Sequence, residues 1–437
     1  MAHIRIPFEE SEIELDLPQT WRVISEIKPK SSPLLKEISK SLIHELEHPI
    51  GCSPISFFGL SGKRIVIAVD DITRPTPTHL FFGDLLEYLF HYGARREDML
   101  LITALGVHRP MTQKEFEKKL GAANISGIKW LNHDSQDIEA HVPLGATKRG
   151  TEVYLNKHLK DADLILCLGM IEPHPLLGFG GGLKMILPGL AHEKTIAQNH
   201  MQGVSPERFN YIGCPESPMR LDLEDAVGLL NKRIFIINCI LNHELKITRF
   251  ICGDPIKAHR EGARISESIN AYPVHEKADA AIVGSSPMNA DLRQGLKSIA
   301  NIERSVKDGG LIIAFLECRE GVGDIPTHKK SLPIDNRVLR LFLKILGKGR
   351  ILWFIDKFKK DAGIEERFLS HFSMQIARKN AIFIYSRRLP PGIDKKVGLF
   401  RQYSDPRAMI REAERYLPKG ANVYVSPYGG ATYPKMD

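Results

Sequence analysis

Cysteine is scarce in this chain, and the few cysteines present argue against a secreted fold held together by disulfides. The 437 residues contain six cysteines, and no two of them form a C-x-x-C pair. Four of the six lie within or beside apolar runs, as buried thiols do. This usage is typical of a reducing compartment, so we expect a cytoplasmic protein.

Long apolar runs and an export signal are also missing. The most apolar stretches, residues 162–171 and 233–241, have the length of buried strands and are too short for a membrane-spanning helix. The N-terminus, MAHIRIPFEESEIELDLP, carries acidic residues where a secretory signal needs a basic start and an apolar run. We expect a soluble protein with no membrane partner.

Nucleic-acid-binding motifs are absent, although the formal net charge is +8. The lysines and arginines are scattered instead of gathered in one stripe, which argues against a nucleic-acid partner. A mild positive balance also raises the local concentration of small anions at a cleft. We therefore expect an acidic small molecule, and not a nucleic acid, as the partner.

Short β-branched runs alternate with helical stretches, and this alternation predicts an α/β fold with mainly parallel sheets. Between the first two runs, residues 78–93 have the apolar spacing of a crossover helix that stops at Gly93. The first set of runs comprises residues 64–71, 98–106, 162–170 and 233–241.

A second set of such runs predicts a second α/β domain. These runs occupy residues 278–286, 309–317, 380–388 and 422–430. We place the boundary near residue 268, which gives domains of residues 1–268 and 269–437. Since ligands of open α/β sheets bind at the carboxyl ends of strands, we expect the active site in the cleft between the two domains.

The segment DDITRPTP, residues 70–77, follows the first predicted strand and contains two prolines that stiffen it. Arg74 carries the planar fork that binds a carboxylate or phosphate through two hydrogen bonds, and Asp71 and Thr73 can bond sugar or phosphate groups. The competing interpretation is a helix N-cap formed by Thr73 with a first-turn proline.

His108 lies in GVHRPMT, residues 106–112, directly after another predicted strand. An imidazole can take up or release a proton near neutral pH, and this loop reaches the edge of the sheet where a site is expected. His108 is therefore a catalytic candidate. A structural or surface histidine is the competing interpretation.

The densest motif is IEPHPLLGFGGGLKMILPGLAHEKTIAQNH, residues 171–200. After its glycines a helix can begin, with Lys184 at the junction. The spacing matches neither a P-loop, because leucine precedes and methionine follows the lysine, nor a G-x-G-x-x-G dinucleotide loop. Three glycines let the backbone approach a bulky ligand closely and offer N–H groups to a phosphate: Gly180, Gly181 and Gly182.

Lys184 and His200 are candidates for a covalent cofactor link and a metal ligand, since lysine forms amide-like links and imidazole suits nickel, copper or zinc. One alternative is a zinc site made by His174, His192 and His200, although their spacing matches no H-E-x-x-H helix and no cysteine joins them. Another is a structural glycine-rich turn with solvent-facing histidines.

Together these motifs resemble the nickel-dependent lactate racemases and their 2-hydroxy-acid racemase and epimerase relatives. The similarity spans nearly the whole chain, from the D-x-T-R-P loop at Asp71 to the closing VYVSPYGGATYP segment. DDITRPTP, GVHRP, EPH, GFGGGLK and NH are each weak signals alone, and their joint occurrence is specific.

The resemblance implies a nickel-pincer nucleotide, pyridinium-3,5-bisthiocarboxylic acid mononucleotide nickel, attached covalently at Lys184. It also implies that His200 is the protein's nickel ligand in a planar site, and that Asp71, Thr73 and the glycine loop hold the ribose and phosphate. The N-terminal domain is then the cofactor-binding and catalytic one. Proteins of cofactor biosynthesis become expected partners.

The reaction implied is racemisation or epimerisation of a small 2-hydroxy acid, by hydride abstraction from C2 through a 2-keto acid. His108 and His174 match the family's two bases. Arg74 matches its substrate-anchoring arginine. Gln294 and Lys297 match substrate contacts made by the second domain.

Arg293 departs from the family's pattern, in which a tyrosine precedes the Gln-x-x-Lys unit. It is a further substrate-binding candidate and indicates a substrate larger or more anionic than lactate. The competing interpretation is that Arg293 points to solvent. The competing functions are another metal-dependent or lysine-Schiff-base enzyme acting on hydroxy or keto acids, and a nonenzymatic protein that binds acidic metabolites or the cofactor.

Overall fold

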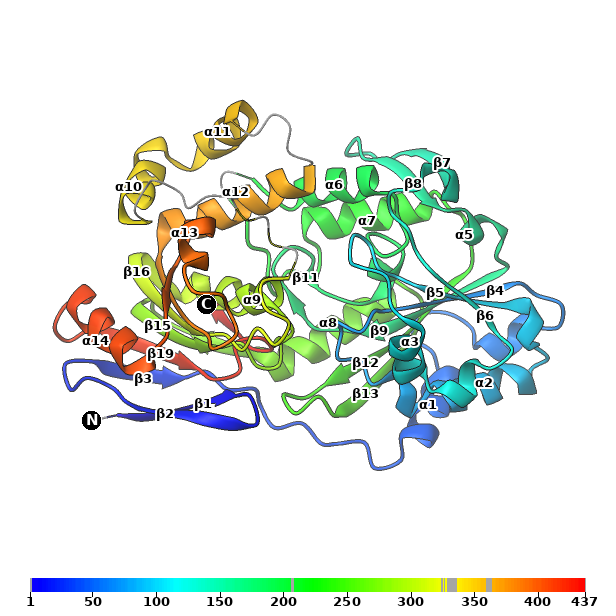
Figure 1. The fold of residues 1–437 in the computed structure, drawn as a ribbon. Coiled ribbons are helices and arrows are strands. Elements are labelled where there is room, and N and C mark those ends of the chain that lie inside the picture. The colour runs from blue at the N-terminus through cyan, green and yellow to red at the C-terminus, as the bar shows by residue number, and fades with distance from the viewer. Residues whose placement is uncertain are drawn as a thin grey trace.

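Two six-stranded sheets wrapped by helices organise the chain (Figure 1). The computed structural model describes residues 2–205, 208–323, 325, 327, 336–358 and 364–436. In the first sheet every neighbouring pair is parallel except β12 with β13. In spatial order its strands are β13 (Ile247–Gly253), β12 (Ile234–Leu241), β9 (Leu164–Met170), β4 (Ile65–Val69), β5 (Met99–Thr103) and β6 (Lys129–Asn132).

The second sheet is parallel throughout. The mainly parallel α/β fold predicted from the sequence is thereby confirmed. In spatial order the strands are β18 (Arg401–Tyr403), β17 (Ala381–Tyr385), β16 (Val306–Phe315), β15 (Ala278–Gly284), β19 (Asn422–Ser426) and β3 (Arg22–Glu26).

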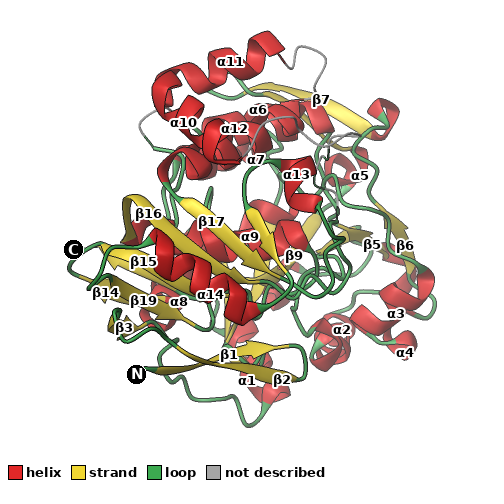
Figure 2. Ribbon diagram, turned by 60° about the vertical axis from the view of Figure 1, so that its left-hand side comes forward, coloured by secondary structure: helices red, strands yellow, loops and turns green. Residues whose placement is uncertain are grey.

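Helices connect the strands and cover both faces of each sheet (Figures 1 and 2). The predicted crossover helix over 78–93 is a short 3₁₀ turn followed by α2. The described chain contains no helix long and apolar enough to cross a membrane. The helices are α1 (Ile38–Glu47), α2 (Phe82–His91), α3 (Gln113–Leu120), α4 (Ala122–Ile125), α5 (Lys157–Asp161), α6 (Glu193–Gln202), α7 (Pro218–Gly228), α8 (Lys257–Asn270), α9 (Leu292–Ile302), α10 (Asn336–Leu346), α11 (Ile351–Phe358), α12 (Ile364–Lys379), α13 (Ile393–Val397) and α14 (Pro406–Tyr416).

Alternation along the buried strands sends side chains into separate apolar layers. In β15, Ile282 packs in the layer that holds Met409 of α14, whereas its neighbour Val283 packs in the layer that holds Ile299 of α9. The layer with Ile299 also contains Ile165 of the first sheet. One continuous core therefore joins the two sheets.

The N-terminal strands lie with the second sheet, although the sequence analysis grouped them with the first. Strand β3 pairs with β19, and the hairpin of β1 (His3–Phe8) and β2 (Ser11–Asp16) buries Ile6 and Phe8 in the same layer as Ile282. Their every-second-residue apolar pattern needs a sheet face to cover, and the second sheet supplies it. Strand β3 therefore belongs to the sheet built mainly from residues 278–426, and the division into two domains at residue 268 stays a prediction.

Three small two-stranded sheets complete the fold. They pair β7 (His141–Ala146) with β8 (Glu152–Asn156), β10 (Pro173–His174) with β11 (Gly178–Phe179), and β14 (Ala271–Val274) with β20 (Tyr433–Met436). The β10–β11 pair matters most for function, because it folds the segment after β9 back on itself beside the glycine loop.

Candidate functional site

The loop after β4 is a tight turn built on Asp71. Its Oδ1 accepts a hydrogen bond of 2.6 Å from the backbone N–H of Thr73, and its carbonyl accepts one of 3.0 Å from the N–H of Arg74. Thr73 caps no helix, since the following 3₁₀ turn (Thr78–Leu80) is preceded by Pro77 and has no side-chain cap. The alternative interpretation of this segment as a helix N-cap is wrong.

A buried lysine that sequence reasoning missed fixes this turn. Lys119 of α3 places its Nζ 2.7 Å from Oδ1 of Asp70 and donates a 2.9 Å hydrogen bond to the carbonyl of Arg74. Both partners of the ion pair are almost fully buried. One sequence feature could have predicted this role: Lys119 is a charged residue on the apolar side of a helix, beside Phe116 and Leu120.

His108 is oriented by Asp71. Its Nδ1 lies 2.8 Å from Oδ2 of Asp71. Burial raises the pKa of Asp71, but the hydrogen bond and charge of His108 and the charge of Arg74 outweigh it, so the pKa lies well below its usual value. An ionised carboxylate only accepts, so Nδ1 of His108 carries the hydrogen, which leaves Nε2 of the neutral ring as a base.

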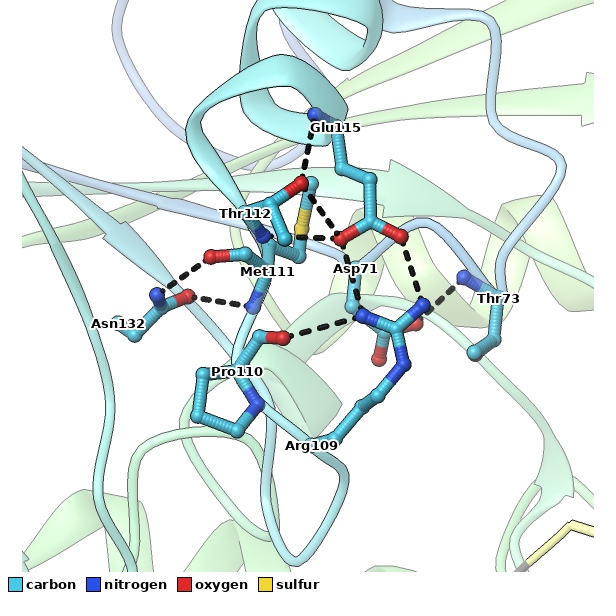
Figure 3. A network of polar contacts seen from close by, with 8 residues as sticks. All are labelled: Asp71, Thr73, Arg109, Pro110, Met111, Thr112, Glu115 and Asn132. Atoms are coloured by element: carbon cyan, nitrogen blue, oxygen red, sulfur yellow. Dashed lines mark hydrogen bonds and ion pairs between the residues drawn. The ribbon is translucent and has the colours of Figure 1, made fainter.

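The loop that carries His108 is itself held in place, as Figure 3 shows. Arg109 forks onto Glu115 with distances of 2.6 and 2.9 Å, and Thr112 forms a capping box with Glu115 at the start of α3. The side chain of Asn132 bonds both backbone groups of Met111. His108 therefore sits on a loop with little freedom.

His174 lies on β10, and its ring nitrogens have the opposite roles to those of His108. Its Nδ1 accepts hydrogen bonds from the backbone N–H groups of Leu176 and Leu177, at 3.3 and 3.2 Å. In the neutral ring the hydrogen is then on Nε2. Burial, followed by the charges of Lys184 and Lys297, holds the pKa of His174 well below its usual value.

The glycine loop forms a close-fitting turn beneath Lys184. Gly181 and Gly182 have φ of +72° and +62°, and a Cβ on Gly181 would lie 2.5 Å from the carbonyl oxygen of Met170. The N–H of Gly182 donates a 2.7 Å hydrogen bond to Oδ1 of Asn238. The carbonyl oxygen of Gly180 is 2.8 Å from Nε2 of buried His259. Position 181 therefore accepts only glycine unless the backbone shifts, and the positive φ of Gly182 also favours glycine.

The helix expected after the glycines is a single 3₁₀ turn, Gly182–Met185. Lys184 lies in this turn, and burial, together with the positive charge of Arg74, lowers its pKa well below the usual lysine value. Pro188 soon after it lacks the N–H that a longer helix would need. Lys184 is thus a half-buried amine that favours its neutral, nucleophilic form.

Helix α9 brings the second sheet to the loop after β4. Asp291 caps its first turn, and Arg74 donates a 2.9 Å hydrogen bond to Oε1 of Gln294. One turn further, the Nζ of Lys297 is buried and makes no hydrogen bond within the part of the chain described. Burial and the charge of Arg74 lower the pKa of Lys297 to about 7. Arg293 also contributes positive charge there.

His200 lies in the last turn of α6, and its Nδ1 is 2.7 Å from the carbonyl of Ile196. Donation to that carbonyl leaves Nε2 as the ring's basic nitrogen, the arrangement that orients a metal-binding histidine. Among the described residues no three His, Cys, Asp or Glu side chains form a metal cluster, so the zinc site is not found. His192 is instead the N-cap of α6.

The structure thus brings several predicted residues together. Arg74, Lys184, Lys297 and His200 are all near enough to His174 to act on its charge. Glu172, which sequence reasoning passed over within E-P-H, is buried among them, and its negative charge acts on both lysines. The arrangement can bind a small anion, hold a covalent cofactor and exchange protons.

These features are those of an α/β enzyme in which several cationic side chains gather around a buried carboxylate. The lactate racemase N-terminal domain model matches residues 8–210. Lactate racemase of Thermoanaerobacterium thermosaccharolyticum is 32% identical over 360 residues, which cover 80% of this chain and 82% of the relative. That of Lactiplantibacillus plantarum is 28% identical over 342 residues, covering 77% and 80%. The chain belongs to the lactate racemase family and is a racemase, an isomerase, which excludes the nonenzymatic alternative.

Two solved structures share the fold. The lactate racemase apoprotein from T. thermosaccharolyticum superposes with a TM-score of 0.80 over 99% of this chain and 100% of its own, at 24% identity. A protein from Thermotoga maritima superposes with a TM-score of 0.67 over 93% of this chain and 100% of its own, at 18% identity. At these identities the likeness concerns the fold alone.

The buried ion pair of Lys119 yields a stability prediction. Lys119→Met leaves Asp70 buried without its counter-ion, which we expect to lower the free energy of unfolding by about 3–5 kcal/mol. Lys118→Met, an exposed neighbour on the same helix, should change it by less than about 0.5 kcal/mol. Urea unfolding followed by circular dichroism measures both. Equal midpoints for the two variants would show that the pair does not hold the loop.

Proposed function

We propose that this racemase interconverts the configurations of a small 2-hydroxy acid by reversible hydride transfer to a nickel-pincer nucleotide tethered at Lys184, through a 2-keto acid. The observation that carries the proposal is the place of Lys184 in the turn directly after the glycines, where the charges of Arg74 and Lys297 act on it and on His174. The contact of Arg74 with Gln294 supports an active site between the two sheets. The six free cysteines support a cytoplasmic location.

The residues present fit this cofactor. The left-handed backbone of Gly181 and Gly182 turns the chain sharply directly before Lys184, where the tether would form. The hydroxyl of Thr73 is buried without a hydrogen-bond partner among the described residues, as expected of a group that awaits a ligand. Lys184 would carry the tether, His200 would bind the nickel, and Asp71, Thr73 and the glycine loop would hold the nucleotide.

When bound, the nucleotide supplies a reversible acceptor for the C2 hydride. The chain supplies the remaining chemistry. Arg74 and Lys297 bind the substrate carboxylate, and Gln294 holds the fork of Arg74 in place. Nε2 of His108 accepts the hydroxyl proton. His174 presents Nε2–H, so it donates in this state, and it can serve as the second base only when Leu176 and Leu177 release Nδ1.

A second candidate rests on the same lysine. An amine of lowered pKa also suits a Schiff base with a keto acid. In that case borohydride would trap the substrate on Lys184, and nickel would not be needed for activity.

The division of roles among four side chains can be tested on protein from a cofactor-producing host. Wild type should show an adduct at Lys184 by intact mass. His200→Ala should lose nickel, whereas His108→Ala and His174→Ala should keep it yet interconvert substrate in neither direction, a loss of about 100-fold or more. Active protein with unmodified Lys184 would refute the tether. Equal nickel retention in all three histidine variants would refute the assigned ligand.

The pKa of Lys297, about 7, predicts the pH dependence of substrate binding. Below that pH the amine is protonated and attracts the carboxylate, and above it the charge is lost. KM should therefore rise as pH passes upward through about 7, because binding of an anion favours the protonated form. Lys297→Arg keeps its charge and should flatten this rise. Initial rates of racemisation measured by chiral chromatography give KM, and identical profiles would disprove the assignment.

Arg293 predicts the class of substrate. Its charge near Lys297 suits a second carboxylate or the hydroxyls of a sugar acid, so kcat/KM should be higher for malate or a sugar acid than for lactate. Arg293→Tyr should remove about 10-fold or more of that preference, the size of one charge-assisted hydrogen bond. If lactate is the best substrate of the wild type, or the ranking survives the substitution, Arg293 has no part in specificity.

A further inference from the structure

Helices α10 and α11 carry apolar side chains that nothing in the described chain covers. Both lie at the periphery of the molecule, outside α12 (Figures 1 and 2). The described residues include fourteen large apolar side chains that are exposed, and six of these fall within residues 336–358. We call these six the outer patch: Val338, Leu341, Phe342, Ile345, Trp353 and Phe358.

The outer patch is a helical face and not scattered exposure. Its four members on α10 are spaced i, i+3, i+4 and i+7, which places them along one side of the helix. The other side of α10 carries Leu343, which is buried with Ile351, Ile355 and Ala377 of α11 and α12. Helix α10 is therefore apolar on two sides, and only one side is used by the fold.

Aromatic contacts make the patch continuous from one helix to the next. The rings of Phe342 and Phe354 are 5.3 Å apart, and those of Phe354 and Phe358 are 4.7 Å apart. Ile345 and Trp353 are 75% and 55% exposed. A contiguous surface of this kind on a folded protein marks an interaction site.

The charge around the patch identifies its partner. Residues 336–358 contain six lysines and arginines against one acidic residue, and the exposed cations include Lys344, Lys348, Arg350 and Lys357. The Nζ of Lys357 lies 5.0 Å over the ring of Trp353. Aliphatic and aromatic side chains interleaved with cations are typical of helices that lie in the interface of an anionic bilayer.

We propose that α10 and α11 form an interfacial anchor that binds this enzyme reversibly to membranes containing anionic lipids. With 11 and 8 residues the helices are too short to span, so they lie in the plane of the headgroups. The expectation of no membrane partner rested on the lack of a spanning segment, and an interfacial helix needs none. A second copy fits less well, since two patches of like charge would repel across an isologous interface.

Vesicle flotation of the full chain tests the anchor. Wild type should float with vesicles of phosphatidylcholine and phosphatidylglycerol, remain free with pure phosphatidylcholine, and dissociate as salt is raised. The emission of exposed Trp353 should shift to the blue on binding, and Trp353→Phe should lose that shift. Leu341→Ser with Ile345→Ser should weaken binding at least about tenfold, and Lys344→Gln with Lys348→Gln about 30-fold.

Phe57→Ser is the matched control, because Phe57 is 77% exposed and lies outside the patch. It should bind as the wild type does, and unchanged circular dichroism and melting temperature should show that every variant is folded. Failure of the wild type to float, or flotation that the Leu341 and Ile345 substitutions leave unchanged, would overturn the proposal. So would a dimer in light scattering that those substitutions dissociate while no flotation occurs, since the partner would then be a second copy.

Discussion

The gathering of several basic side chains around one buried carboxylate is the constraint on which this site depends. Arg74, Lys184 and Lys297 approach His174, and Glu172 is the carboxylate buried among them. Unpaired charge is costly away from water, so the two lysines and the histidine favour their neutral forms. In the proposed function, an anionic substrate or a nucleotide phosphate supplies the missing counter-charge where the protein alone is electrostatically unsatisfied.

The fold holds these groups in place through contacts from both sheets. The ion pair of Lys119 with Asp70 holds the loop after β4, and that loop in turn orients His108 through Asp71. Helix α9 approaches the same loop from the second sheet through Gln294. Since one apolar core runs through both sheets, a shift of either would disturb the charges at the site.

Strands and helices could be predicted from the sequence where a single local pattern of apolar residues set them. Strands β4 and β9 formed within the runs 64–71 and 162–170 because the residues of each strand are apolar and buried on both faces. Strand β3 was not predictable, since Arg22–Glu26 is short and only partly buried, and its place depends on pairing with β19 some 400 residues later. The helix expected after the glycine loop shrank to one 3₁₀ turn, as Pro188 interrupts it.

By itself the sequence determined the family and the chemical types at the site: an amine after a run of glycines, histidines after strands, and an arginine on a stiff loop. Only the tertiary structure decided how they act. Asp71 and His108 are 37 residues apart, and Arg74 and Gln294 are 220 apart, so no local pattern reports either contact. The proton positions on His108 and His174 follow from those partners. Hydrogen bonds and burial set pKa values and tautomers, and both depend on neighbours that only folding brings together.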